Sequence, residues 1–225
     1  PSRFNSQTTQ NCAEQLAREL GCYYTAIPIE QSVEHTKKQI NGTIITNLQN
    51  GKKEKLKLSD FMVENIQARD RGSRLLPAIA SAWDAVYSCN GNKAEASIGY
   101  FTMYGDGTGF FAPIGDLWKW QVYELARYMQ EAIFQKPILQ DIIDLPPSAE
   151  LSPAQDVEKG LGDPLVYPYH DHLFAVWADW INPAGPDKLL RWYMEGTLGT
   201  KINCEDLGLV YRLFPTPQDF IQDLE

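Results

Sequence analysis

Apolar residues recur at helical spacing over much of this chain. The clearest case runs from about Thr8 to Leu20, where apolar side chains share one face and Gly21 follows in the position that often ends a helix. Another long pattern begins at Ser59, a good N-cap residue, and Pro77 should kink or divide that helix. The predicted helices after the first cover 29–40, 59–83, 93–98, 119–132, 171–180, 186–194 and 215–225.

Two apolar runs are instead typical of β-strands. CYYTAIPI at 22–29 is aromatic and β-branched, and AVYSC at 85–89 has the composition of a buried strand. The polar segment 41–57 contains the short run TIIT and predicts a surface excursion such as a hairpin, whereas 135–168 reads mostly as loop. Helices that alternate with buried strands predict an α/β fold, with an open, mostly parallel sheet, flanking helices and extra C-terminal helices.

Composition narrows the class of protein. The chain has 225 residues, 44% of them hydrophobic, which suits one large globular domain or part of one. Its net charge of −9 argues against a general nucleic-acid binder. Four cysteines without CxxC spacing indicate free thiols in a reducing cytoplasm rather than a zinc site or disulfides. We find no signal peptide and no apolar run of the ~18 residues that a membrane span needs.

The stretch 86–121 has the pattern of a nucleotide pocket. A short apolar run leads into polar and glycine-rich loops, and Lys119 then begins a helix. Glu95 follows the apolar run closely, where a carboxylate could hold Mg²⁺ together with nucleotide phosphates. On pattern alone a solvated glutamate and a solvated first-turn lysine are the simpler interpretations.

Several ordered motifs carry a family resemblance. They are ENIQARDR at 64–71, YFTMYGDG at 100–107, PIGDLWK at 113–119 and PSAEL at 147–151. Together they resemble the synthetase domain of NAD synthetases, especially the glutamine-dependent kind. The resemblance implies the adenine nucleotide α-hydrolase-like fold of N-type ATP pyrophosphatases. It also implies a ligase that amidates deamido-NAD to NAD through an adenylated intermediate.

The resemblance assigns roles to individual residues. It implies that ATP is bound by Asn90, Lys119 and Ser148, although Asn90 stands where the family usually has threonine. It implies that Glu95 binds the metal ion. It implies that deamido-NAD is bound by Asn65, Arg69, Glu95, Tyr100, Phe101, Thr102 and Met103. Arg71, displaced from the face shared by Asn65 and Arg69, is expected to be structural and paired to a carboxylate. No side-chain nucleophile is implied, so no catalytic residue is assigned.

The resemblance also implies partners. ATP is a co-substrate, Mg²⁺ the metal ion, and deamido-NAD and ammonia the other substrates. Met103, where ammonia-dependent members have a lysine, favours the glutamine-dependent branch, whose ammonia comes from a separate glutaminase domain. A homo-oligomer in the cytoplasm, with no nucleic acid and no membrane, is expected.

One family motif is not found in this chain. The pyrophosphatase loop SGGxDS is absent, so we expect two inner strands, that loop and a helix to be missing before residue 1, and the C-terminal tail to be cut. Residues 1–225 are therefore expected to be a segment of a longer protein and inactive alone. Two alternatives remain open: a non-catalytic folding or dimerisation portion, and another N-type ATP pyrophosphatase. The latter would lack ENIQAR and YFTxYGDG.

Overall fold

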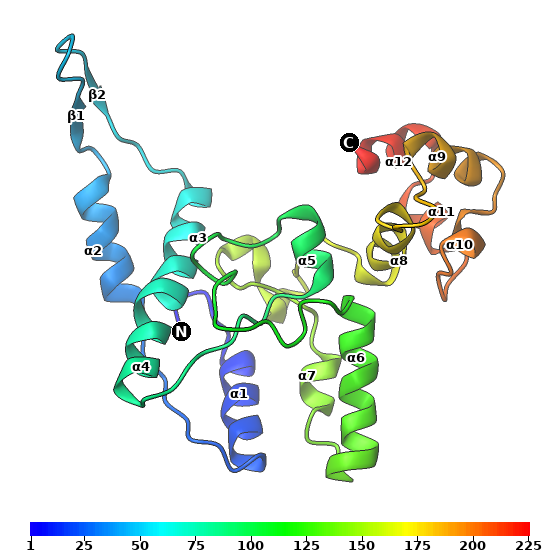
Figure 1. The fold of residues 1–225 in the computed structure, drawn as a ribbon, viewed down its shortest axis with the longest axis horizontal. Coiled ribbons are helices and arrows are strands. Elements are labelled where there is room, and N and C mark those ends of the chain that lie inside the picture. The colour runs from blue at the N-terminus through cyan, green and yellow to red at the C-terminus, as the bar shows by residue number, and fades with distance from the viewer.

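The computed structural model describes all residues from 1 to 225 and is predominantly helical (Figure 1). Its first half contains α1 (Gln7–Glu19), α2 (Glu30–Ile40), β1 (Ile44–Thr46), β2 (Lys53–Lys55), α3 (Asp60–Arg69), the π-helical segment η1 (Asp70–Leu75), α4 (Leu76–Ala82) and α5 (Lys93–Ile98). Its second half contains α6 (Lys119–Tyr128), the π-helical segment η2 (Met129–Phe134), α7 (Gln140–Asp144), the 3₁₀ turns η3 (Pro153–Gln155) and η4 (Val157–Lys159), α8 (Tyr167–Trp177), α9 (Pro186–Met194), α10 (Leu198–Lys201), α11 (Leu209–Leu213) and α12 (Pro217–Leu224). None of these helices has the length and hydropathy to cross a bilayer.

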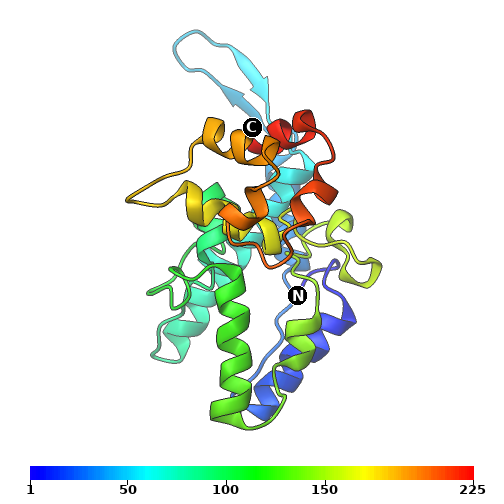
Figure 2. The ribbon, with the colours of Figure 1, turned by 90° about the vertical axis from the view of Figure 1, so that its right-hand side faces the viewer.

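The predicted parallel sheet is not formed by these residues. The single sheet is an antiparallel hairpin in which Ile44 pairs with Lys55 and Thr46 with Lys53, and it projects away from the body of the molecule (Figures 1 and 2). The segment 22–29 is extended but unpaired, and 85–89 makes only a parallel bridge to the segment around Phe111. Both strand predictions are therefore wrong as regular strands, because a parallel strand exists only when neighbouring strands complete its hydrogen bonds.

The predicted helices are confirmed, with shifts of a few residues at their ends. Local capping explains where they begin: the Ser6 and Ser59 side chains accept from the backbone N–H groups of Thr9 and Met62. Gly21 adopts a positive φ of 67° just after α1, as its position predicts. The α8 helix begins at Tyr167, four residues earlier than expected, and the short α10 and α11 have no clear periodicity in the sequence.

The long helix predicted over 59–83 is divided. Its middle, Asp70–Leu75, is π-helical, and Pro77 lies in the first turn of α4 immediately afterwards. Proline removes a backbone donor and crowds the preceding turn, which accounts for a break at this place. The division places Arg69 and Arg71 in different segments, which matters for the site below.

Most of the buried apolar side chains lie in the C-terminal helices. Ten buried residues from α8 through α12, among them Tyr169, Leu189 and Phe220, form one cluster. A smaller cluster of Ala94, Trp118 and Tyr167 joins α5, the start of α6 and α8. This smaller cluster fixes the three helices that border the site.

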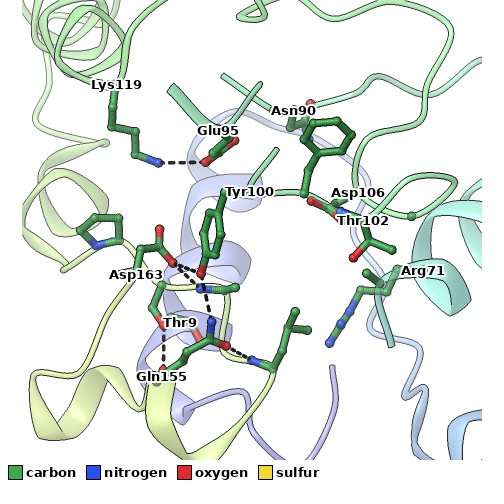
Figure 3. Close-up of a pocket in the computed structure, with 18 of the residues that line it drawn as sticks. Thr9, Arg71, Asn90, Glu95, Tyr100, Thr102, Asp106, Lys119, Gln155 and Asp163 are labelled. Atoms are coloured by element: carbon green, nitrogen blue, oxygen red, sulfur yellow. Dashed lines mark hydrogen bonds and ion pairs between the residues drawn. The ribbon is translucent and has the colours of Figure 1, made fainter. Parts of the chain in front are cut away.

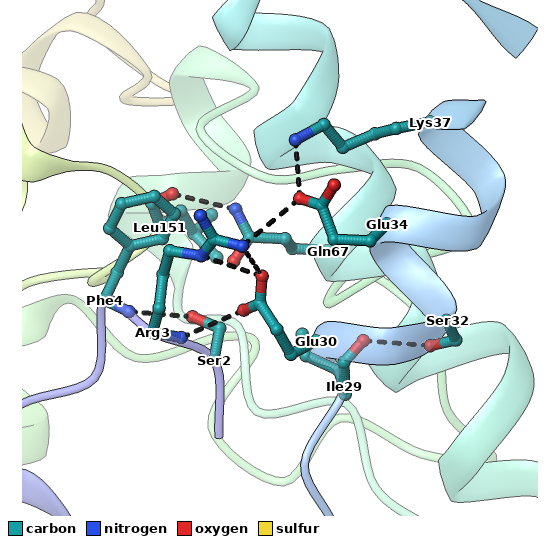
Figure 4. Close-up of polar contacts among 10 residues, drawn as sticks. All are labelled: Ser2, Arg3, Phe4, Ile29, Glu30, Ser32, Glu34, Lys37, Gln67 and Leu151. Atoms are coloured by element: carbon teal, nitrogen blue, oxygen red, sulfur yellow. Dashed lines mark hydrogen bonds and ion pairs between the residues drawn. The ribbon is translucent and has the colours of Figure 1, made fainter.

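The N-terminal loop is held by polar contacts (Figure 4). The Arg3 guanidinium donates to Glu30 at 2.7 Å through Nε and lies 3.3 Å from Glu34, both on α2. Next to this loop, the buried Glu150 carboxylate accepts from the Ser6 backbone N–H at 3.1 Å and the Thr9 hydroxyl at 2.7 Å. These contacts connect the start of α1 to the loop that contains Ser148.

Candidate nucleotide-binding site

A cavity of about 780 Å³ lies between α3, α5, the start of α6 and the loop segments 99–108 and 139–163 (Figure 3). Its volume is in the range of cofactor and ligand sites. Polar groups from all of these segments face into it together with apolar side chains such as Phe61, Tyr123 and Ile143. It collects residues that are far apart in the sequence.

Eight of the ten residues that the sequence assigned to substrates line this cavity. They are Asn65, Asn90, Glu95, Tyr100, Phe101, Thr102, Lys119 and Ser148. The other two, Arg69 and Met103, lie outside it on the exposed surface, where Arg69 Nε donates to the Met103 carbonyl oxygen at 3.1 Å. The cavity thus brings together the residues assigned to ATP with most of those assigned to the dinucleotide.

Glu95 has two roles in the structure. Its Oε2 accepts from the backbone N–H of Asn92 at 2.9 Å and completes the capping box that begins α5. Its Oε1 lies 4.0 Å from Lys119 Nζ, and both side chains are about one-fifth exposed (20% and 22%). Burial raises the pKa of Glu95, an effect that the Asn92 hydrogen bond and Lys119 oppose.

Lys119 is the first residue of α6 and extends its ammonium group toward the cavity (Figure 3). Besides Glu95, its Nζ lies 5.2 Å from the ring centroid of Tyr167, in a cation–π arrangement. The ammonium therefore has a carboxylate at the long limit of an ion pair and an aromatic face. Neither partner saturates its hydrogen-bonding capacity, so it can also bind an anion.

The loop 145–163 closes one side of the cavity through Asp163. Its carboxylate accepts from the Tyr100 hydroxyl at 3.1 Å, the Tyr167 hydroxyl at 2.9 Å and the Ala149 backbone N–H at 3.1 Å. Burial, followed by the nearby Asp163 charge, raises the pKa of Tyr100, so this hydroxyl remains protonated. Ser148 Oγ donates to the Gln155 carbonyl at 2.7 Å, and Gln155 Nε2 donates to the Tyr100 hydroxyl at 3.0 Å.

The opposite wall is formed by a second hydrogen-bonded group. Thr102 Oγ1 donates to Asn65 Oδ1 at 2.7 Å, and the Thr102 backbone N–H donates to Asp106 at 2.9 Å. Asn90 accepts from the Ser88 hydroxyl at 2.8 Å, which leaves its amide nitrogen as a donor for a ligand. Asp106, like Asp163 and Gln155, was not selected in the sequence, since a single polar residue in a loop carries no periodic signal.

Arg71 differs from what its position in the sequence predicts. It lines the cavity and is half-buried, and no carboxylate lies within ion-pair distance of its guanidinium, so the predicted pairing is not seen. Its guanidinium Nη2 donates a hydrogen bond to Asn5 Oδ1 at 3.1 Å. Burial lowers the pKa of Arg71, although the group remains a cation at neutral pH. An unpaired half-buried cation that lines a cavity is suited to an anionic ligand.

The glycine-rich loop at 104–109 packs directly on η1. A Cβ built on Gly72 would lie 1.9 Å from the Gly105 carbonyl oxygen, which is far inside van der Waals contact. Ser73 Oγ donates to the Tyr104 carbonyl beside this approach. Only glycine at position 72 allows the loop to reach its place on the cavity wall.

We therefore expect Gly72→Ala to lower the free energy of unfolding by ~2–3 kcal/mol, with a decrease in Tm of roughly 5–10 °C. The added methyl group must displace backbone, which cannot rotate away as a side chain would. Gly185→Ala is the matched control, because no atom lies within 4 Å of its Cβ position and its φ is −66°. Thermal unfolding of both variants by circular dichroism checks this, and an equal Tm for Gly72→Ala and the control would contradict it.

Solved structures first define the class. The chain superposes with a TM-score of 0.55 on a glutamine-dependent NAD⁺ synthetase from Acinetobacter baumannii in complex with ADP, at 29% identity over 66% of this chain and 26% of that one. An NMN synthetase from Francisella tularensis gives a TM-score of 0.61 over 90% of this chain and 73% of that one, at 24% identity, which supports the fold alone. These are nucleotide-handling synthetases with the predicted adenine nucleotide α-hydrolase fold.

The chain belongs to the NAD synthase family, whose sequence profile matches residues 1–180. It is 31% identical over 176 residues to a glutamine-dependent NAD(+) synthetase of Xanthomonas campestris pv. campestris (strain 8004). That alignment covers 76% of this chain and 30% of the relative, so the chain spans about a third of that protein's length. The family membership removes the alternative of another N-type ATP pyrophosphatase.

Proposed function

We propose that this chain forms the ATP- and deamido-NAD-binding part of a ligase that amidates deamido-NAD to NAD. The observation that supports this most is the cavity, which collects eight of the ten residues expected to contact substrate, in a chain of the NAD synthase family. The two NAD synthetases named above are glutamine-dependent, and Met103 agrees with that branch. The ammonia would therefore originate from glutamine.

The charges in the cavity suggest where each part of the substrates lies. The ammonium of Lys119 and the guanidinium of Arg71 are the cations of the lining, and we assign them to phosphates. Tyr100 and Phe101 supply aromatic surface, which suits the nicotinate ring. The amide of Asn90 adds a neutral donor for ATP. The Ser148 hydroxyl would donate to a phosphate by exchanging its present acceptor, the Gln155 carbonyl.

Glu95 is the proposed ligand of Mg²⁺. One carboxylate with one oxygen free of short hydrogen bonds fits an ion that takes one or two protein carboxylates and fills its remaining positions with phosphate and water. No group of three or more acidic, histidine or cysteine side chains is arranged as a metal cage, which agrees with that mode. When bound, Mg²⁺ would neutralise charge on the phosphates.

The proposed reaction needs binding and shielding rather than a protein nucleophile. The nicotinate carboxylate attacks the α-phosphorus of ATP, the bond to pyrophosphate breaks, and ammonia then displaces AMP from the adenylate. Lys119 and Arg71 would stabilise the negative charge that develops on the leaving pyrophosphate. The loop around Ser148 and Asp163, held by Tyr100 and Tyr167, would exclude water that could hydrolyse the adenylate.

Further strands from outside residues 1–225 would complete the fold. The extended segments 22–29 and 85–89 have unpaired backbone groups, and apolar side chains near them are exposed: Tyr23 by 89%, Trp83 by 62% and Val86 by 58%. Such edges and patches are normally covered. We propose that additional strands with a pyrophosphate-binding loop cover this face, that a glutaminase domain delivers ammonia, and that the protein is a homo-oligomer.

Isothermal titration of ATP with Mg²⁺ tests the proposal, with the protein in the form that the cell produces. We expect saturable binding that weakens when EDTA removes Mg²⁺, and NAD formation from deamido-NAD, ATP and ammonia. Titration with GTP is the control for a general affinity for triphosphates. Absence of both ATP binding and NAD formation would favour the alternative, a non-catalytic folding or dimerisation portion.

A further inference from the structure

Asp171 is a buried carboxylate outside the cavity. It lies on α8, its exposed fraction is 0%, and its Oδ2 accepts from the backbone N–H of Trp120 at 2.9 Å. Its other oxygen, Oδ1, has no hydrogen-bond partner. A buried carboxylate with an unsatisfied oxygen is destabilising by itself, so its presence requires an explanation.

The helix that Asp171 contacts is α6, and the contact lies in its first turn. The N-cap residue of α6 is Trp118, which has no side-chain oxygen to accept from the free backbone N–H groups there. The carboxylate of Asp171 performs that function from a different helix. Its negative charge lies at the positive, N-terminal end of the α6 dipole, where it interacts favourably. The start of α6 is therefore fixed by α8.

The same helix also contacts the side chain of Lys119. Tyr167, the first residue of α8, presents its ring 5.2 Å from Lys119 Nζ, while Asp171, one turn further along α8, binds the backbone directly after Lys119. Lys119 is thus held at its ammonium by Tyr167 and at its backbone by Asp171. A shift of the first turn of α6 would move the ammonium relative to Glu95, 4.0 Å away.

We propose that Asp171 is a positioning residue that fixes Lys119 at the cavity by capping α6 with a buried negative charge. The assignment of Lys119 to phosphate rests on the proposed function; the capping of α6 by Asp171 does not. The ligand affected is the triphosphate of the nucleotide. Asp171 itself does not touch the cavity.

Burial supports a positioning role over a stabilising one. It raises the pKa of Asp171 to about 6, against the hydrogen bond from Trp120 and the charge of Lys119. Because folding raises this pKa above that of the unfolded chain, the ionised carboxylate destabilises the fold above about pH 6, and protonation relieves this as the pH falls. A buried carboxylate that lowers stability while it binds the backbone next to Lys119 is better explained by positioning than by stabilisation.

Asp171→Asn separates the two roles, because asparagine keeps the size and an acceptor oxygen but not the charge. At pH 7.5 we expect Tm to be equal to or above that of the wild type, while Kd for ATP with Mg²⁺ rises about 10-fold. Amide hydrogen exchange at Trp120, followed by NMR, should accelerate at least 5-fold, because a neutral amide oxygen accepts a weaker hydrogen bond than a buried carboxylate. The control is Asp179→Asn, an exposed aspartate that accepts from the N–H groups of Ile181 and Asn182 and does not contact α6.

The pH dependence gives an independent readout. The charged or titratable groups around Asp171 are Lys119 and Tyr123 from α6, His170 from α8 and, beyond Lys119, Glu95 from α5. The wild-type affinity for ATP should fall between pH 7.5 and 5.5 as Asp171 binds a proton. The same titration of Asp171→Asn gives the control: the part of the decrease in ATP affinity that is absent in this variant is due to protonation of Asp171.

Unchanged Trp120 exchange and unchanged Kd in Asp171→Asn would overturn the proposal, and so would an increase in Kd that merely follows a lower Tm. If the wild type fails to bind ATP, the proposed function fails, but the exchange at Trp120 still decides whether Asp171 holds α6. Exchange at Trp120 that accelerates in Asp171→Asn but stays at the wild-type rate in Asp179→Asn supports the positioning role.

Discussion

Glu95→Gln should reduce ATP-dependent NAD formation at least ~100-fold, the size of effect expected when a group that supports transition-state charge is removed. Stability should change little, because glutamine at the third position of a helix still accepts from the Asn92 backbone N–H and preserves the capping box. The loss would thus reflect the missing carboxylate charge beside Lys119. The initial rate of NAD formation is measured over a range of Mg²⁺ concentrations.

Glu95→Ala extends this test. It removes both the charge and the capping interaction, so it should abolish activity and also lower the free energy of unfolding by ~1 kcal/mol. Glu124→Gln, an exposed carboxylate on α6 outside the cavity lining, serves as the control and should retain activity. Retained activity with unaltered Mg²⁺ dependence in Glu95→Gln would exclude Glu95 as the metal ligand.

Arg71→Ala should weaken the binding of ATP with Mg²⁺ by roughly 10–100-fold, which corresponds to the loss of one hydrogen-bonded charge of ~1.5–3 kcal/mol. The reason is that Arg71 is half-buried, lines the cavity and has a neutral side chain, Asn5, as its hydrogen-bond partner. Arg71→Lys should recover part of the affinity, since it restores the charge but not the planar donor geometry. Titration calorimetry gives Kd for each variant.

Two further arginines make this prediction specific. Arg74 lies in the same π-helical segment as Arg71, but it is exposed, is outside the cavity lining and is paired to Asp70 at 2.7 Å. It is therefore the control, and Arg74→Ala should leave Kd for ATP near the wild-type value. Arg69→Ala examines the separate prediction that Arg69 contacts deamido-NAD, read as KM for that substrate. If Arg74→Ala weakens ATP binding as much as Arg71→Ala, the role assigned to Arg71 is refuted.

The helices were largely predictable because their signals are local. Ser6 and Ser59 cap helices with their own side chains, and the positive φ of Gly21 occurs where the periodic pattern ends. The strands were not predictable in the same way. The aromatic and β-branched run at 22–29 has strand character, yet a parallel strand forms only against neighbours, and none of the 225 residues supplies them there.

The site was predictable only in part. Motif resemblance selected Glu95, Lys119, Tyr100 and Ser148, and the cavity brings all four to its lining. It did not select Asp163, which joins Tyr100, Tyr167 and the loop around Ser148 by three hydrogen bonds. The bond between Asp163 and Tyr100 spans 63 positions, and a contact over that separation leaves no periodic trace in one sequence.

The order of residues along the chain was enough to predict the family, most helices and most of the side chains that line the cavity, because caps, periodicity and short motifs act over a few positions. The direction of individual side chains was decided by packing in three dimensions. Arg69 and Arg71 are two positions apart, yet the π-helical segment after α3 and the close approach of Gly72 to Gly105 place only Arg71 at the cavity. Likewise, Asp171 reaches the first turn of α6 only because α8 packs beside it, a contact across 51 residues of sequence.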